Sequence, residues 1–109
     1  MSAIIAQRDL QVVGENGIEH GFVRLHAPEE RDGAFWCAVH LKLPCLEQNI
    51  PIAGADSYQA LVLAMQFVPN LVSFSDAFRA GRLHELGSTD PLKDLAFSFG
   101  FAPLEGRLQ

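Results

Sequence analysis

The chain has 109 residues, of which 49% are hydrophobic and 19% charged, and a formal net charge of -5 at pH 7. This length fits one domain spanning residues 1–109, and the high apolar fraction excludes a disordered chain. Its 8 Lys and Arg residues are scattered along an acidic chain. This argues against nucleic-acid binding, which needs clustered cations to neutralise phosphates.

The compartment is predicted from features that the sequence lacks. The N-terminal segment has no basic region, and no uncharged run approaches the roughly 20 residues that span a bilayer. The two cysteines, Cys37 and Cys45, are too few for a disulfide framework. We therefore expect a cytoplasmic protein with reduced thiols and no membrane contact.

The first 45 residues predict an antiparallel β-meander, because apolar and polar positions alternate with the period of two that strands require. The three strands are predicted at residues 3–13, 18–27 and 34–43. Asn16-Gly17 predicts the first hairpin turn and Asp32-Gly33 ends a polar second turn, since these residue types tolerate positive φ. Cys45 to Asn49 is expected to be a connector. Residues 50–53 predict a short edge strand, because Pro51 cannot donate to a ladder.

A helical period begins after this sheet. Asp56, followed three residues later by Gln59, is typical of a capping box. The predicted apolar stripes are Tyr58, Leu61, Val62 and Met65, continued by Val68 and Val72, and beside it Leu63, Phe67, Leu71, Phe74 and Phe78. Pro69 removes one backbone hydrogen bond, so we expect the helix to be kinked or split near residues 65–69. A first helix over 57–68 and a second helical segment ending near Gly81 are predicted.

The C-terminal part alternates large and small residues. Residues 82–94 predict a loop, and residues 95–101 predict a strand. Most of the phenylalanines in the second half are expected in the core, and an edge position for this strand would allow a homodimer. The predicted fold class is α+β: an antiparallel three- to four-stranded β-meander packed against one main helix, kinked or split at Pro69, with a C-terminal strand.

Two segments carry a resemblance to a known group of proteins. These are Phe35-Trp36-Cys37-Ala38-Val39 and the helix start Gly54-Ala55-Asp56-Ser57-Tyr58-Gln59-Ala60-Leu61. The chain resembles small bacterial proteins of unknown function over residues 18–78, some of which lie beside toxin or immunity genes. The resemblance implies a curled antiparallel sheet packed on one helix, and it assigns no catalytic residue.

One candidate interaction surface follows from the strand period. His20, Phe22, Arg24 and His26 share one face of the second strand, and Trp36, His40 and Lys42 share one face of the third. A common face for both sets would give an aromatic and cationic patch that binds a carboxylate or a protein, with Trp36 as anchor. The alternative is an ordinary solvated face with Trp36 half covered by the C-terminal segment.

Other polar groups have simpler structural explanations. Asp56 can cap the helix or mark an anion site, and capping is preferred because a carboxylate there repels anions. Cys37, His40 and Cys45 have ligand chemistry, but strand geometry places Cys37 and His40 on opposite faces. The acidic residues near the hairpin tips are expected to serve solubility, with an acidic rim for a basic partner as the alternative. We predict no catalytic residue, metal site or cofactor.

Three functional hypotheses remain at this point. The first is a non-catalytic protein-interaction module, of which an immunity-type inhibitor is one form. The second is a homodimeric structural or regulatory subunit. The third is a small-ligand-binding protein or enzyme that uses the histidine-bearing sheet face.

Overall fold

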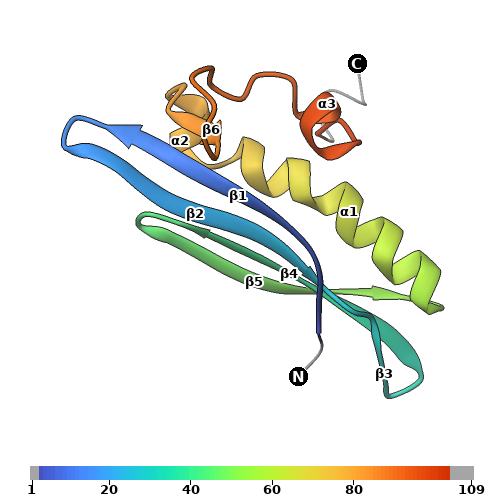
Figure 1. Cartoon of the computed structure of the whole chain (residues 1–109). Helices are drawn as coiled ribbons and strands as arrows, with labels where there is room; N and C mark the ends of the chain where they lie inside the picture. Colours follow the sequence, from blue (N-terminus) through green and yellow to red (C-terminus); the bar gives the residue numbers. More distant parts are fainter. Residues whose placement is uncertain (1–2, 104–109) are drawn as a thin grey trace.

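The chain folds into one antiparallel sheet with its helices on one side, in a computed structural model that describes residues 3–103 (Figure 1). The strands are β1 (Ile4–Gly14), β2 (Gly17–His26), β3 (Glu29–Arg31), β4 (Ala34–Leu43), β5 (Leu46–Gly54) and β6 (Leu83–Glu85). The helices are α1 (Ser57–Ser73), α2 (Asp76–Arg79) and α3 (Leu95–Phe99). The predicted α+β class is confirmed, and the sheet has 6 strands, more than predicted.

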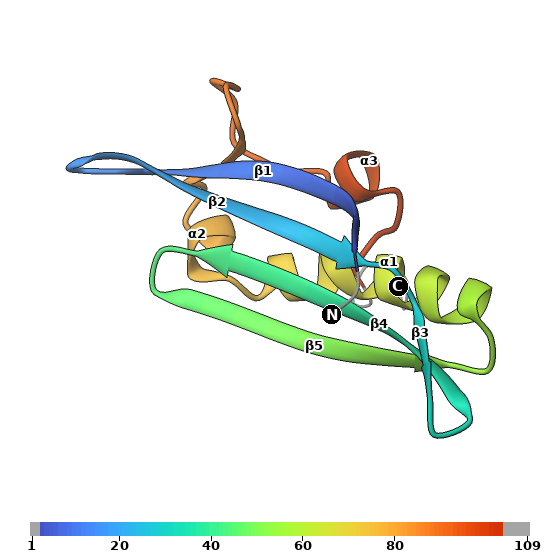
Figure 2. The same cartoon turned by 60° about the horizontal axis from the view of Figure 1, so that its bottom comes forward.

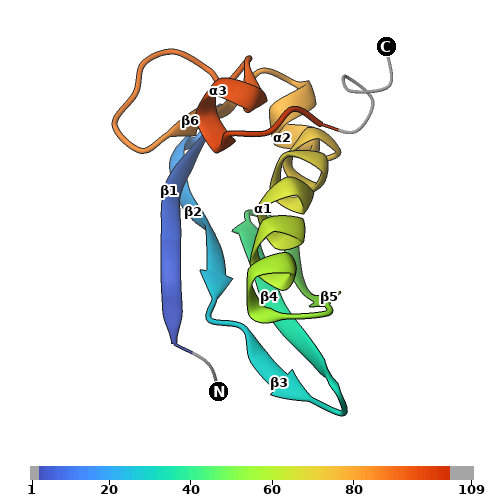
Figure 3. The same ribbon diagram turned by 90° about the vertical axis from the view of Figure 1, so that its right-hand side faces the viewer.

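Strand β4 pairs with three other strands of the sheet, β2, β3 and β5. The strand order is β3-β4-β2-β1-β6, and β5 pairs with β4 outside this path. Along one edge β4 pairs with β5 from Phe35↔Gly54 to Leu43↔Leu46. Along the other edge it pairs with β3 through residues 34–36 and with β2 through residues 39–42. Strands β2 and β3 therefore follow one another beside β4, separated by a break at Pro28 (Figure 3).

The predicted meander is confirmed in its first three long strands, and β5 is longer than predicted. The connector expected after Pro44 is a two-residue turn in which Cys45 takes φ 64°. Proline at the first central position and positive φ at the second are the features of a type II turn. This turn folds the chain back at once, so residues 46–49 join the strand.

Positive φ angles identify the residues of the two hairpin turns that adopt a left-handed backbone conformation. Asp32 and Gly33 both have positive φ, 54° and 82°, as the predicted Asp-Gly turn requires. In the first hairpin the turn consists of Glu15 and Asn16, and the positive φ falls on Gly17 at 121°. The hairpin prediction is thus confirmed, with the turn centred one residue earlier.

Helix α1 begins as the sequence predicts. Asp56 Oδ1 accepts a hydrogen bond from the Gln59 backbone N–H at 2.7 Å, and Gln59 Oε1 accepts one from the Ala55 N–H at 2.6 Å. The two bonds form a variant of the capping box, because Gln59 accepts from Ala55, one residue before the cap, and they satisfy two otherwise unpaired donors. The predicted cap is therefore confirmed, and the Asp56 carboxylate occupies the place that an anion would need.

Of the two expectations for Pro69, a kink or a split of the helix, the split is wrong. Helix α1 continues through Pro69 to Ser73, and the break falls afterwards, where Ser75 caps α2. Proline removes only one hydrogen bond from a helix. The Pro69 ring is fully buried, so packing against the rest of the core offsets that loss.

The buried stripe of α1 agrees with the predicted one only in its C-terminal half. The helix buries Ala60, Ala64, Val68 and Val72, four residues apart, which places them on one face. Small side chains on this row let the helix lie close to the sheet, while Tyr58 is 77% exposed. The predicted Val68 and Val72 are confirmed as buried. Leu61 and Met65 are only partly buried against the core, because the small Ala60 and Ala64 face the sheet instead.

The predicted C-terminal strand is wrong, because residues 95–99 form α3. Asp94 Oδ1 accepts a hydrogen bond from the Phe97 N–H at 3.2 Å, and Gly100 ends the helix with φ 86°. The segment predicted as a loop contains β6, which pairs with β1. The strand through which a homodimer was expected to pair is therefore a helix in the structure.

The expectation that most phenylalanines of the second half lie in the core is confirmed only in part. Phe74 is 61% exposed and Phe97 is 90% exposed. Phe67, Phe78 and Phe99 are partly buried and pack against the core. Aliphatic residues from the sheet, together with the small row of α1, form the fully buried centre. None of the helices within residues 3–103 is long and apolar enough to cross a membrane.

Candidate functional site: the open face of the sheet

The sheet has one face against the helices and one face without them. We call the second the open face; Figure 2 looks toward it, with α1 behind the strands. Residues directly opposite in an antiparallel pair project from the same face. The helix-side face is identified by buried residues such as Val39 and Leu41, so their neighbours in β4 project from the open face.

All seven residues of the predicted surface lie on the open face. Phe22 pairs with Lys42, and Arg24 pairs with His40. Alternation then places His20, His26 and Trp36 on the same side. The sequence did not decide whether the two sets of residues share a face. The β2–β4 register shows that they do.

Arg24 is held in a defined position at the centre of this face. Its guanidinium carbon lies 3.7 Å from the Phe22 ring centroid. Its Nε donates a hydrogen bond to Gln7 Oε1 at 2.6 Å, and Gln7 Nε2 donates to Asp9 Oδ1 at 2.6 Å. A stacked ring and a chain of hydrogen bonds therefore orient a side chain that is otherwise rich in rotamers.

His40 is positioned by two neighbours. Its ring lies 5.0 Å from the Phe22 ring in an edge-to-face arrangement, and its Nε2 is 2.7 Å from Glu47 Oε2. The hydrogen bond with His40 lowers the pKa of the Glu47 carboxyl, assisted by the charge of Lys42. The Glu47 carboxylate thus remains charged to a lower pH than a free glutamate side chain.

Trp36 lies at the end of the open face beside β3. Its indole N–H donates to the Arg31 carbonyl at 3.2 Å, and the Arg31 guanidinium carbon lies 5.1 Å from the ring centroid. The described C-terminal residues lie on the helix side of the sheet (Figure 1). The alternative in which that segment covers Trp36 is therefore wrong for residues 95–103.

The charges on this face are unevenly paired. Within residues 3–103, neither Arg24 nor Arg31 forms an ion pair with a carboxylate. By contrast, the carboxylates of Asp9 and Glu47 are engaged by Gln7 and His40. Arg24 and Arg31 thus present guanidinium groups without a carboxylate at ion-pair distance, whereas Lys42 lies opposite Glu47 on the same face.

The prediction from sequence missed Gln7, Asp9 and Glu47. Gln7 and Asp9 lie two residues apart and alternate with Ala6 and Leu10 of the apolar face, so the strand period predicts that they share the other face. The position of Glu47 on this face could not be predicted, because the sequence analysis assigned residue 47 to a connector. Only the register Lys42↔Glu47 brings it beside His40.

The cysteines are separated in the way that strand geometry predicts. Cys37 is fully buried on the helix side, where its Sγ donates to the His26 carbonyl at 3.1 Å. Burial raises the pKa of this thiol, and a raised pKa makes the reactive thiolate rarer. Cys45 is exposed in the turn before β5. Within residues 3–103 no group of three or more potential ligands gathers around a metal position.

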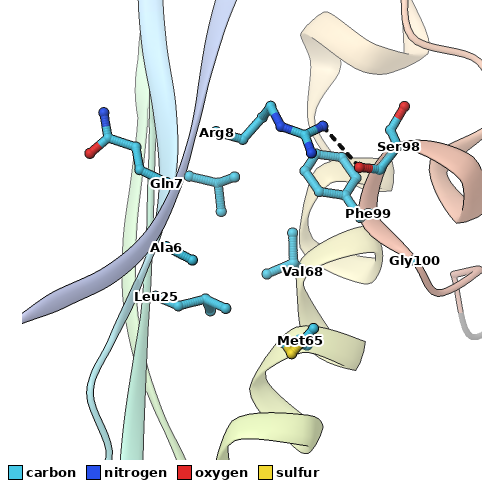
Figure 4. A pocket seen from close by; sticks show the side chains of 10 residues that line it. Ala6, Gln7, Arg8, Leu25, Met65, Val68, Ser98, Phe99 and Gly100 are labelled. Atoms are coloured by element: carbon cyan, nitrogen blue, oxygen red, sulfur yellow. Dashed lines mark hydrogen bonds between the residues drawn. The ribbon is translucent and has the colours of Figure 1, made fainter.

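A cleft lies on the other side of the sheet, between β1, β2, α1 and α3 (Figure 4). Its volume is about 380 Å³, and its walls include Val23, Leu25, Met65, Val68 and Phe99. This volume is within the range of small-molecule sites. No residue of the predicted interaction surface lines this cleft.

The geometry defines the class of protein: a small α+β domain with a single antiparallel sheet, helices on one face and an open face of aromatic and charged side chains. The sequence profile of the family Domain of unknown function (DUF6968) matches residues 6–97. The chain therefore belongs to this family, and the match extends beyond residues 18–78 on both sides. No curated protein and no solved structure matches the chain.

Proposed function

We propose that this protein is a non-catalytic protein-interaction module whose open face binds an acidic surface of a partner protein. The observation that carries the proposal is the oriented Arg24, stacked 3.7 Å from Phe22 on a sheet face without helices. A guanidinium presents a planar fork of donors that matches a carboxylate. An arginine already held in place loses less conformational entropy on binding.

The neighbouring residues support the same partner chemistry. Lys42 adds a second cation beside Phe22, and Trp36 adds a large ring of the kind enriched in binding hot spots. Both side chains lie on the face of Arg24. A partner that places a carboxylate over Arg24 and an apolar side chain on Trp36 would match the face in charge and shape.

The proposal extends to the type of module and to its cellular location. An immunity-type inhibitor, which the sequence resemblance suggests, would be one form of such a module. A reducing cytoplasm would be a compatible location, because Cys37 and Cys45 are both free thiols.

The sheet edge favours a partner on the face over strand addition. In the β4–β5 hairpin, hydrogen-bonded and non-bonded pairs alternate from the closing pair Leu43↔Leu46. Pro51, opposite Ala38, belongs to a non-bonded pair in this alternation. Its backbone nitrogen therefore faces the free edge of β5. Proline has no N–H, so an added strand would lack a donor at the centre of β5. The homodimeric alternative therefore gains no support from this edge.

Capture from native lysate with three matched baits tests the proposal. Wild type and Tyr58→Ser, altered on an exposed helix position, are expected to retain the same stoichiometric protein. Arg24→Glu is expected to lose it, because the carboxylate of the partner would meet a like charge. Melting curves establish that all three baits are folded. Equal retention of one protein by all three baits, or no stoichiometric partner with wild type, would overturn the proposal.

A further inference from the structure

The helix-side cleft exists because α1 covers only part of the sheet. Helix α1 lies mainly across β4 and β5, and α3 covers one end of the space left above β1 and β2 (Figure 3). Val23, Leu25 and Val68 form a well-packed floor, whereas Met65 and Phe99 are partly exposed at the rim. A molecule in this space would remove the apolar rim from water.

Arg8 spans the upper end of the cleft, from β1 toward α3 (Figure 4). Its Nη1 donates to the Ser98 carbonyl at 2.8 Å and to Glu85 Oε1 at 2.9 Å. Its guanidinium carbon lies 5.4 Å from the Phe99 ring centroid. The bonds within residues 3–103 use Nη1 alone, so the donors of Nε and Nη2 are available to a ligand.

The charge at this end of the cleft is already balanced. Glu85 forms an ion pair with Arg8, and both side chains are roughly half exposed. A carboxylate ligand would gain from Arg8 but meet Glu85, and an ammonium ligand would meet the opposite conflict. An uncharged acceptor can bond to Nε or Nη2 without either repulsion.

We propose that this cleft binds an uncharged molecule with a linear apolar chain and one terminal hydrogen-bond acceptor, such as a medium-chain alcohol, ester or amide. The chain lies along Leu25, Met65 and Val68, and the terminal oxygen accepts from Arg8. The cleft opens on the helix side of the sheet. The proposed ligand and the proposed partner therefore occupy opposite faces of the sheet, with Gln7 of β1 adjoining both sites.

Three probes of equal chain length test the chemistry: 1-octanol, octanoate and octylammonium, each titrated into the full chain and followed by calorimetry. Wild type is expected to bind octanol at least tenfold more tightly than either charged probe. Glu85→Gln leaves Arg8 without its counter-charge, so octanoate should become the tightest ligand. Tighter binding of octanoate than octanol by wild type, no change in preference in Glu85→Gln, or no binding of any probe would overturn the proposal.

Two variants identify the place of binding. Ala6 is an exposed residue of β1 that lines the cleft. Ala6→Phe should therefore fill the cleft and weaken octanol binding at least tenfold. Ile4→Phe adds the same ring on the opposite face of β1 and should bind octanol like wild type. Equal binding by both variants contradicts this location. Octanol binding that occurs only after removal of residues 104–109 would mean that this segment, rather than a ligand, is the occupant.

Discussion

Gly54 at the end of β5 lies directly against Ala60 in the first turn of α1. A Cβ atom on residue 54 would stand 2.7 Å from the Ala60 Cα and 2.9 Å from the Gln59 carbonyl carbon. Both neighbours are backbone atoms, which cannot move without shifting the helix. The absence of a side chain at Gly54 thus sets how closely the helix start approaches the sheet.

Gly54→Ala should therefore destabilise the protein. Overpacking of this kind typically costs about 1–3 kcal/mol, measurable as a lower midpoint in urea unfolding. Gly14→Ala is the matched control, because an added Cβ there meets only the Gly17 carbonyl, at 3.8 Å. Equal midpoints for the two variants would contradict the close approach of β5 and α1.

The two cysteines should react at very different rates. Cys45 is exposed, whereas Cys37 is fully buried with a raised pKa caused by desolvation. A colourimetric disulfide reagent should modify one thiol rapidly in the native protein and the second only upon unfolding. Cys45→Ser should abolish the rapid phase. A rapid phase of two thiols in wild type would show that Cys37 is accessible.

Cys45→Gly should stabilise the fold. Cys45 adopts φ 64° without being glycine, and a left-handed conformation costs an ordinary residue about 1–2 kcal/mol. Glycine removes this strain but gains entropy in the unfolded chain, so the expected net gain is about 1 kcal/mol. Cys45→Ser retains the strain and should unfold at the wild-type denaturant concentration. A destabilised Cys45→Gly would show that the turn is not strained.

The Glu47–His40 contact should make stability depend on acid. The pKa of Glu47 is lowered in the folded protein, first by its hydrogen bond with His40. A lowered pKa means that the contribution is fully present above the unfolded pKa of about 4.3 and is lost as pH falls through the folded value. Wild type should therefore lose stability relative to Glu47→Gln as pH is reduced from 5.5 to about 3. A constant difference between their unfolding midpoints over this range would contradict the interaction.

Local sequence patterns predicted an element correctly where the pattern was compatible with only one structure. The alternation in residues 34–43 predicted β4, and Asp56 with Gln59 predicted the start of α1. These features involve neighbouring residues only. The predicted face of seven residues was likewise readable, because the period of two assigns sides within each strand.

Two segments were wrongly predicted because a local pattern was compatible with two structures. Leu95 to Phe101 alternates like a strand, but Asp94 caps its first turn and Gly100 ends the helix. Those cap residues were the overlooked signal. Pro69 was expected to break a helix, yet its burial keeps α1 continuous. Burial depends on the packed sheet, so no window of sequence contains it.

By itself, therefore, the sequence determined a small acidic α+β chain with its meander, its helix cap and the face that alternating residues share in β2 and β4. The tertiary structure decided which strands neighbour one another, and with them the contacts of Arg24 and Glu47 on the open face. It also placed Arg8, Glu85 and Phe99 around one cleft. The reason is physical: alternation is a property of one strand, whereas register and helix placement follow from long-range packing.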